Sequence, residues 1–201
     1  MSISTRGRVV GSLFWLAMLA YLSGTVLVAA AAGRPILTAA GVLLMLLNSA
    51  VVATIGIVVR PVLRRYDGTS ALAYLVSRVV EAVLLAVGVV FVLRLMPVAA
   101  EYAYQLAMIA VGLGGVVLCR VLLRARLVAP LVAIWGLVGY ALLGLSAGLE
   151  VLGVRVGLLL SVPGGLFELA LGVLLIVRGF PMDTRGAPVG VPATVAVEPA
   201  R

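Results

Sequence analysis

The sequence predicts an all-α fold: a polytopic transmembrane helical bundle of six spans with both termini in the cytoplasm. Of the 201 residues, 64% are hydrophobic and only 11% are charged, and the mean hydropathy is +1.29. Soluble domains average about 45–50% apolar and about 25% charged residues. The composition therefore excludes an ordinary water-soluble domain. It also excludes an extended disordered chain, which needs low hydrophobicity and high charge.

Long apolar runs are the second observation behind this prediction. They do not alternate between apolar and polar residues, as the strands of a membrane barrel do, so helices are the predicted form. A helix needs about 17–25 residues to cross the hydrocarbon core. Six runs of suitable length lie between breaks marked by charged, Pro or Gly residues, at 9–32, 36–59, 70–93, 102–119, 127–149 and 156–177.

The first run follows Arg6 and Arg8, as the apolar part of a secretory signal peptide would. That part of a signal peptide has about 7–15 residues, whereas this run has about 24. It also contains Trp15 and Tyr21. We therefore expect a helix that is retained in the mature protein.

The later runs are bounded by their flanking charges. The second ends before Arg60, and the third begins at Ser70. The fourth is the shortest, and we expect its helix to continue into Arg120 and Arg124, whose long stems can reach the interface. The fifth has ample length, and the sixth ends before Arg178.

The distribution of Arg is the third observation, because cytoplasmic loops carry an excess of basic residues. With the N-terminus inside, three Arg fall outside, at Arg34, Arg94 and Arg155, and Arg78 lies within a span. Eleven fall on the cytoplasmic side: Arg6, Arg8, Arg60, Arg64, Arg65, Arg120, Arg124, Arg126, Arg178, Arg185 and Arg201. All 15 basic residues are Arg, and Ala, Val, Gly and Leu are abundant, which is typical of a GC-rich bacterial genome. We therefore expect a multi-pass protein of a bacterial cytoplasmic (inner) membrane.

The chain is predicted to form one domain with two short flanks. Residues 1–8 are the cytoplasmic N-terminus, residues 9–180 are the six-helix transmembrane domain, and the Pro-rich residues 181–201 are expected to be a disordered cytoplasmic tail. The lipid bilayer is the expected partner. Nucleic acid is not, because no basic patch with interleaved aromatic residues is present.

Missing residue types exclude several chemistries. The chain has no His and no Lys, which excludes His-based catalysis, His metal ligands and Lys Schiff bases. The single Cys119 is expected to be a buried hydrophobe. We predict no catalytic residue, no metal site, no cofactor and no enzymatic activity. Two acids about 5–10 Å apart beside one cavity, as in glycoside hydrolysis, would instead favour a membrane enzyme.

Three ionisable side chains lie inside predicted spans, where a charge normally needs a partner or a cavity. Arg78 and Glu81 share one helical face because they are three residues apart, and Glu168 lies in the last span. Counted from the inner ends of their spans, they are ~12, ~16 and ~15 Å deep. The three can therefore meet near the midplane, with Asn48 and Tyr74 in the same neighbourhood.

Two interpretations of this polar cluster stay open. In the first, it is a structural clasp or part of a regulatory membrane partner, in which one carboxylate neutralises Arg78 and Asn48 bonds across helices. In the second, the surplus carboxyl group carries a proton or binds a cationic substrate in a small transporter or permease. A cavity that reaches Glu168 would favour transport, and a direct contact between Arg78 and Glu168 without a cavity would favour the clasp.

The last span carries a predicted helix break at Pro163, Gly164 and Gly165. Pro removes a backbone donor and two Gly weaken the helix further. Interrupted helices near the midplane form binding sites in secondary transporters, although a kink can also serve packing alone. Gly residues elsewhere, as at Gly136 and Gly144, permit close helix contacts within the bundle or in a homo-oligomer.

Four segments of the chain are distinctive: Asn48–Ala53, Arg60–Arg65, Ser70–Glu81 and Phe167–Phe180. In these segments the chain resembles the bacterial membrane-protein family catalogued as domain of unknown function 4386, and the resemblance extends over residues 9–181. The resemblance implies a multi-pass helical protein without an assigned activity. It also matches Asn48, Arg78, Glu81 and Glu168 to the family's intramembrane polar positions, whereas Gly164 stands where many members carry a polar or acidic residue.

Overall fold

The computed structural model describes residues 3–180, and these are almost entirely helical and contain no strand. The predicted tail at 181–201 lies outside the described residues. The elements in order are α1 (Ile3–Ala30), α2 (Pro35–Leu63), α3 (Gly68–Leu93), α4 (Pro97–Arg124), α5 (Pro130–Val151), the 3-10 helix η1 (Leu158–Leu160) and α6 (Val162–Arg178). The predicted all-helical class is confirmed.

Five of the helices, α1 to α5, are long and apolar enough to cross a membrane. The fourth helix extends well beyond the predicted run 102–119 and includes Arg120 and Arg124. The last helix, α6, has 17 residues and is shorter than the others. The chain is thus a membrane-embedded protein with several spans.

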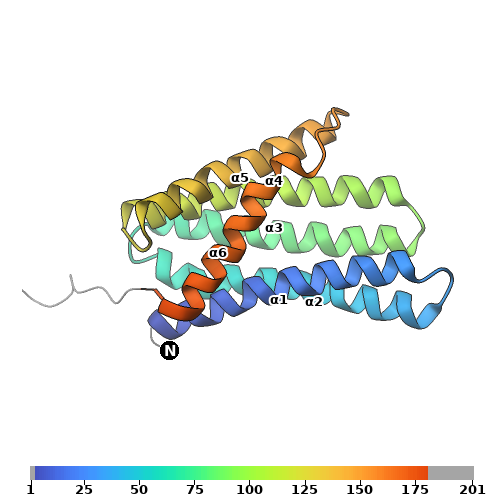
Figure 1. Ribbon diagram of the computed structural model, residues 1–201, viewed down its shortest axis with the longest axis horizontal. Helices are drawn as coiled ribbons and strands as arrows, with labels where there is room; N and C mark the ends of the chain where they lie inside the picture. Colours follow the sequence, from blue (N-terminus) through green and yellow to red (C-terminus); the bar gives the residue numbers. More distant parts are fainter. Residues whose placement is uncertain (1–2, 181–201) are drawn as a thin grey trace, which may run out of the picture.

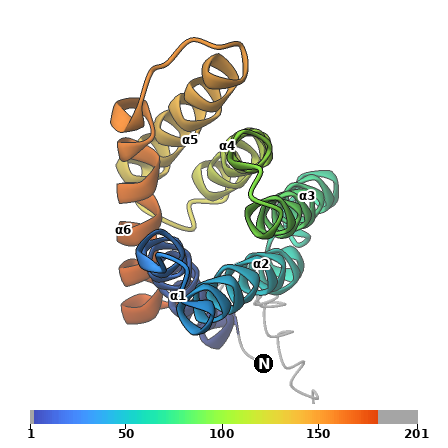
Figure 2. The same ribbon diagram turned by 90° about the vertical axis from the view of Figure 1, so that its right-hand side faces the viewer.

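The six α-helices form a ring in which each helix packs against the next and α6 returns to α1. Figure 1 shows α1 to α5 along the long axis and α6 crossing them obliquely. Figure 2 shows the same helices around a common interior. The N-terminal end of the bundle holds the start of α1, the connections 64–67 and 125–129 and the end of α6, and the far end holds the connections 31–34, 94–96 and 152–161.

Proline marks the start of several helices. Pro35, Pro97 and Pro130 are the first residues of α2, α4 and α5, where the missing backbone donor has no partner to lose. Pro163 is the second residue of α6. The expectation of one broken helix over 156–177 is therefore corrected: the helix begins at Val162, and Pro163 starts it without kinking its interior.

The backbone before α6 folds back along α5 and is held by two polar side chains. The carboxylate of Glu150 accepts hydrogen bonds from the backbone N–H groups of Val156 (2.8 Å) and Gly157 (2.9 Å). The hydroxyl of Ser146 donates to the carbonyl of Gly157 (3.5 Å). This non-helical segment brings the start of α6 beside the middle of α5, where Gly164 packs on Gly139.

Helix α3 begins at a capped N-terminus outside the apolar span. Asp67 accepts hydrogen bonds from the hydroxyl of Ser70 (2.6 Å) and from the backbone N–H groups of Ser70 (3.1 Å) and Thr69 (3.0 Å). The bonds from Ser70 are the main reason that the pKa of Asp67 is lowered from its usual 3.8. This cap sets where α3 begins and hence the register of the polar residues that follow.

Pairs of facing Gly residues allow the helices to approach closely. A side chain added at one member of each pair would collide with the backbone of the other. Only Gly therefore permits this close approach, which is typical of helix packing in membranes. The pairs are Gly24 with Gly41 between α1 and α2, Gly112 with Gly144 between α4 and α5, Gly139 with Gly164 between α5 and α6, and Gly11 with Gly172 between α1 and α6.

The contiguous hydrophobic core fills only one half of the ring. Its members reach no further along the helices than Ala17 in α1, Ala82 in α3 and Leu143 in α5, counted from the N-terminal end. We call this part the N-terminal half and the remainder the far half. The buried hydrophobic residues of the far half lie outside that core and are mostly small: Ala20, Ala31, Val42, Leu85, Val89, Ala103, Ala107 and Ala147.

Candidate functional site

The candidate site is an ionic cluster that joins α3 to α6 across the interior of the ring. The guanidinium of Arg78 donates from Nη1 to Oε2 of Glu81 (2.9 Å) and from Nη2 to Oε1 of Glu168 (3.3 Å). Its Nε donates to the hydroxyl of Tyr74 (3.0 Å). The spacing of Tyr74, Arg78 and Glu81 on one helical face produces three of these four groups, and only Glu168 comes from a distant part of the chain.

Aromatic side chains of the N-terminal half contact both Arg78 and Glu168. The guanidinium carbon of Arg78 lies 5.3 Å from the ring centre of Tyr74 and 5.5 Å from that of Phe14, within the range of cation–π attraction. The hydroxyl of Tyr140 donates to Oε1 of Glu168 (2.7 Å). The ring of Tyr140 in turn meets the edge of Phe167, with centres 5.5 Å apart. Glu168 is thus held by α3 and α5 together.

Two Gly residues make room for these side chains. Gly56 of α2 faces the stem of Arg78, and a Cβ there would lie 2.9 Å from the Cβ of Arg78. Gly115 of α4 faces the ring of Tyr140, and a Cβ there would overlap that ring. Both positions therefore exclude any larger residue unless the cluster moves.

A cavity of about 200 Å³ lies against the cluster on the side of the far half. We call it the central cavity. The exposed fraction of the side chain is 3% for Arg78, 6% for Glu81 and 31% for Glu168, so Glu168 is the accessible acid. The lining residues are Phe14, Ala17, Met18, Tyr21, Leu22, Asn48, Val52, Ile55, Arg78, Glu81, Leu85, Tyr104, Met108, Gly165 and Glu168.

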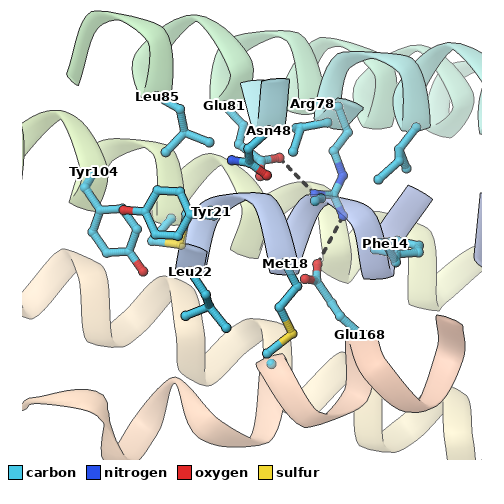
Figure 3. Close-up of a pocket in the computed structure, with 15 residues that line it drawn as sticks. Phe14, Met18, Tyr21, Leu22, Asn48, Arg78, Glu81, Leu85, Tyr104 and Glu168 are labelled. Carbon is cyan, nitrogen blue, oxygen red and sulfur yellow. Dashed lines mark hydrogen bonds and ion pairs between the residues drawn. The ribbon is translucent and has the colours of Figure 1, made fainter. Parts of the chain in front are cut away.

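The residues that the sequence singled out fall into two groups. Asn48, Arg78, Glu81 and Glu168 all line the central cavity, and Tyr74 is buried behind it against Arg78. Figure 3 shows Asn48 beside Glu81.

Of the predicted break, only Gly165 reaches the site. It lines the cavity, and a side chain there would meet nothing within 4 Å. Gly164 instead packs on Gly139. Pro163 belongs to the first turn of α6.

Sequence reasoning did not find the aromatic residues around the cluster. Phe14, Tyr21 and Tyr104 line the cavity, and Tyr140 binds Glu168. Aromatic residues are common in apolar spans, and their spacing alone does not separate an inward ring from a lipid-facing one. The position of Tyr140 between small residues at the same helical spacing was the one available signal.

The arrangement can bind a cation or hold a proton. One guanidinium faces two carboxyl groups, so one negative charge or one dissociable proton is left over. Among the described residues, no group of three or more His, Cys, Asp or Glu side chains could hold a metal ion. Cys119 is buried in the core of the N-terminal half, away from the cavity lining.

A ring of long apolar helices around a buried ionic cluster defines a polytopic helical membrane protein with an intramembrane polar site. The chain belongs to the family described as domain of unknown function (DUF4386), whose model matches residues 9–179. No curated protein and no solved structure matches the chain.

Proposed function

We propose that this protein binds a small organic cation inside the membrane and acts as a small transporter or permease. The observation that carries the proposal is the central cavity, in whose lining the side chain of Glu168 is 31% exposed while that of Arg78 is only 3% exposed. A purely structural clasp would need all its groups paired within a sealed interior. Here one carboxyl group of the cluster faces open space.

The charge balance favours a positively charged ligand. Oε1 of Glu168 accepts hydrogen bonds from Arg78 and Tyr140, which hold that oxygen in place. The side chain of Glu168 is 31% exposed and lines the central cavity. A cation there would neutralise the surplus acid, and a neutral or anionic ligand would leave it uncompensated in an apolar setting, which is costly.

The remaining lining suits an organic cation. Phe14, Tyr21 and Tyr104 present aromatic rings, and Met18 and Met108 present polarizable thioethers. Aromatic cages attract quaternary ammonium groups through the ring quadrupole, and Met adapts to irregular apolar shapes. We propose no catalytic role, because the two acids of the cavity lining, Glu81 and Glu168, both form ion pairs with Arg78.

We further propose six spans with both termini in the cytoplasm of a bacterial inner membrane. Helix α6 alone covers about 25 Å, and the preceding 3-10 turn adds about 6 Å, which together approach the ~30 Å hydrocarbon core. The positive-inside rule supports this orientation. Nine of the Arg residues lie near the N-terminal end of the bundle: Arg6, Arg8, Arg60, Arg64, Arg65, Arg120, Arg124, Arg126 and Arg178.

A binding assay tests the proposal on the full chain in lipid nanodiscs. The probe is benzyltrimethylammonium, a permanent aromatic cation, and its matched control is neopentylbenzene, which has the same shape and no charge. We expect the cation to bind by calorimetry and the neutral control not to bind. Replacement of the acid in Glu168→Gln should weaken binding by about tenfold or more, because a charged contact is lost.

A second variant separates loss of charge from loss of space. Gly165→Leu places a side chain in the cavity without a clash at its Cβ, so it should fold normally and lose binding. If the neutral control binds as well as the cation, or if Glu168→Gln binds the cation as tightly as the unchanged protein, the cationic site is wrong.

The clasp is the second candidate, and the link between α3 and α6 favours it. The ion pair between Arg78 and Glu168 joins these two helices, which are not neighbours in the ring. A clasp without binding predicts that Glu168→Gln lowers stability and that no cation stabilises the protein against unfolding.

A further inference from the structure

A second cavity, of about 440 Å³, lies on the far side of the central cavity. We call it the far cavity. It is lined by residues of α1 to α4, among them Val92 at the end of α3 and Pro97 and Ala100 at the start of α4. These residues place it at the far end of the bundle. In the proposed orientation, this end faces the outside of the cell.

The two cavities share a wall. Tyr21, Leu22, Leu85 and Tyr104 line both of them. The rings of Tyr21 and Tyr104 stack, with centres 5.7 Å apart and planes within 13° of each other. Figure 3 shows this pair at the opposite end of the central cavity from Phe14.

The stacked pair joins two helices that are not neighbours in the ring. Tyr21 belongs to α1 and Tyr104 to α4, so their contact crosses the interior. A tyrosine side chain can change its χ1 rotamer without movement of the helix. Rotation of either ring would join the two cavities into one path toward Glu168.

The far cavity also carries an acid. Glu101 lines it one helical turn before Tyr104, and its carboxylate accepts a hydrogen bond from Nε2 of Gln105 (2.6 Å). A carboxylate at the mouth of a low-dielectric path raises the local concentration of cations. Glu101 and Glu168 thus place one acid on each side of the aromatic pair.

We infer that the far cavity is the access vestibule for organic cations, with Glu101 as its attracting acid and the Tyr21–Tyr104 pair as the barrier before the central cavity. This inference rests on the proposed function, since it takes the same class of ligand to the same acid. It adds that the cation enters from the far end of the bundle and that Tyr21 and Tyr104 control the rate of entry into the central cavity.

Cysteine labelling tests the inference, and the chain is well suited to it because Cys119 is its single Cys. In a Cys119→Ala background, Gly165→Cys places a thiol in the central cavity. The probes are two membrane-impermeant methanethiosulfonates, one with a trimethylammonium group and one with a sulfonate. They are applied to membrane vesicles of either orientation, and the rate of labelling is measured.

We expect the cationic reagent to label Gly165→Cys from the far end, and faster than the anionic one. Adding Tyr21→Ala or Tyr104→Ala should raise the rate by roughly two- to tenfold, which is what loss of a stacked aromatic pair would give. Tyr102→Ala, on the same helix but outside both cavity linings, is the matched control and should change nothing. Glu101→Gln should slow the cationic reagent only.

The outcomes separate the two proposals. If benzyltrimethylammonium binds but neither tyrosine variant changes the labelling rate, or if labelling comes from the N-terminal end, the vestibule is wrong while the binding site stands. If Gly165→Cys is unreactive in every background and the cation does not bind, the central site fails and the vestibule fails with it.

Discussion

The two halves of the ring are built from the same six helices but differ in what fills their interior. In the N-terminal half, large side chains such as Phe167, Leu122 and Leu63 form a continuous core. In the far half, the buried positions are mostly Ala, and two cavities take the place of a core. The difference shows that the length of the apolar runs determines which residues form helices, whereas the size of the inward side chains determines whether the interior between the helices is filled.

The ionic cluster lies where these two halves meet. On one side it rests on Tyr74 and Tyr140, and on the other it faces the central cavity. The N-terminal half holds Glu168 in place through Tyr140. The far half contains the space to which the side chain of Glu168 is exposed.

Removal of Arg78 should have the largest effect. Arg78→Met leaves the carboxyl groups of Glu81 and Glu168 without their cation and should lower the free energy of unfolding by about 3–5 kcal/mol. Titration with SDS in mixed micelles measures it. The triple variant Arg78→Met, Glu81→Leu, Glu168→Leu is the control and should recover most of the loss, because an apolar trio needs no partners. Equal stability of Arg78→Met and the unchanged protein would show that the cluster does not stabilise the bundle.

A change in packing beneath the cluster should have an intermediate effect. Gly115→Ala forces the ring of Tyr140 to move and should cost about 1–3 kcal/mol of unfolding free energy. Gly148→Ala is the matched control in the far half, because a side chain there meets nothing within 4 Å. It should be neutral or slightly stabilising, since Ala favours the helix over Gly. A cost for Gly148→Ala as large as that for Gly115→Ala would mean that the far half is as tightly packed as the other.

The smallest effect should come from the cap of α3, which lies outside both halves. The pKa of Asp67 is lower in the folded protein than in the unfolded chain, so its contribution to stability is present above the unfolded pKa. That contribution disappears as the pH falls through the lower folded pKa. Asp67→Ala should therefore be less stable than the unchanged protein at neutral pH and equally stable in strong acid. A stability difference independent of pH would show that the carboxylate is not the active part of the cap.

The sequence predicted the all-helical class and the approximate positions of the first five helices, because apolar runs and their flanking Arg, Pro and Gly residues are local signals. It also predicted that Arg78 and Glu81 lie on one helical face, since they are three residues apart. The start of α6 was misplaced. The apolar segment at 156–161 reads like a helix, and only the contacts of Glu150 with Val156 and Gly157 show why it is not one.

The central cavity could not be predicted from the sequence. It depends on which inward positions are small across several helices, and that is a property of their mutual arrangement. The pairing of Tyr140 with Glu168, and of Tyr21 with Tyr104, spans 28 and 83 positions of the chain. No local period connects such distant residues.

The central claim is that the interior is open on one side of Glu168 and closed on the other. Two Cys variants on α6 test it directly in a Cys119→Ala background: Gly165→Cys, one turn toward the far half, and Leu171→Cys, one turn toward the packed half. We predict that a trimethylammonium methanethiosulfonate labels Gly165→Cys and leaves Leu171→Cys unlabelled. Labelling of both thiols at similar rates, or of Leu171→Cys alone, would contradict the account.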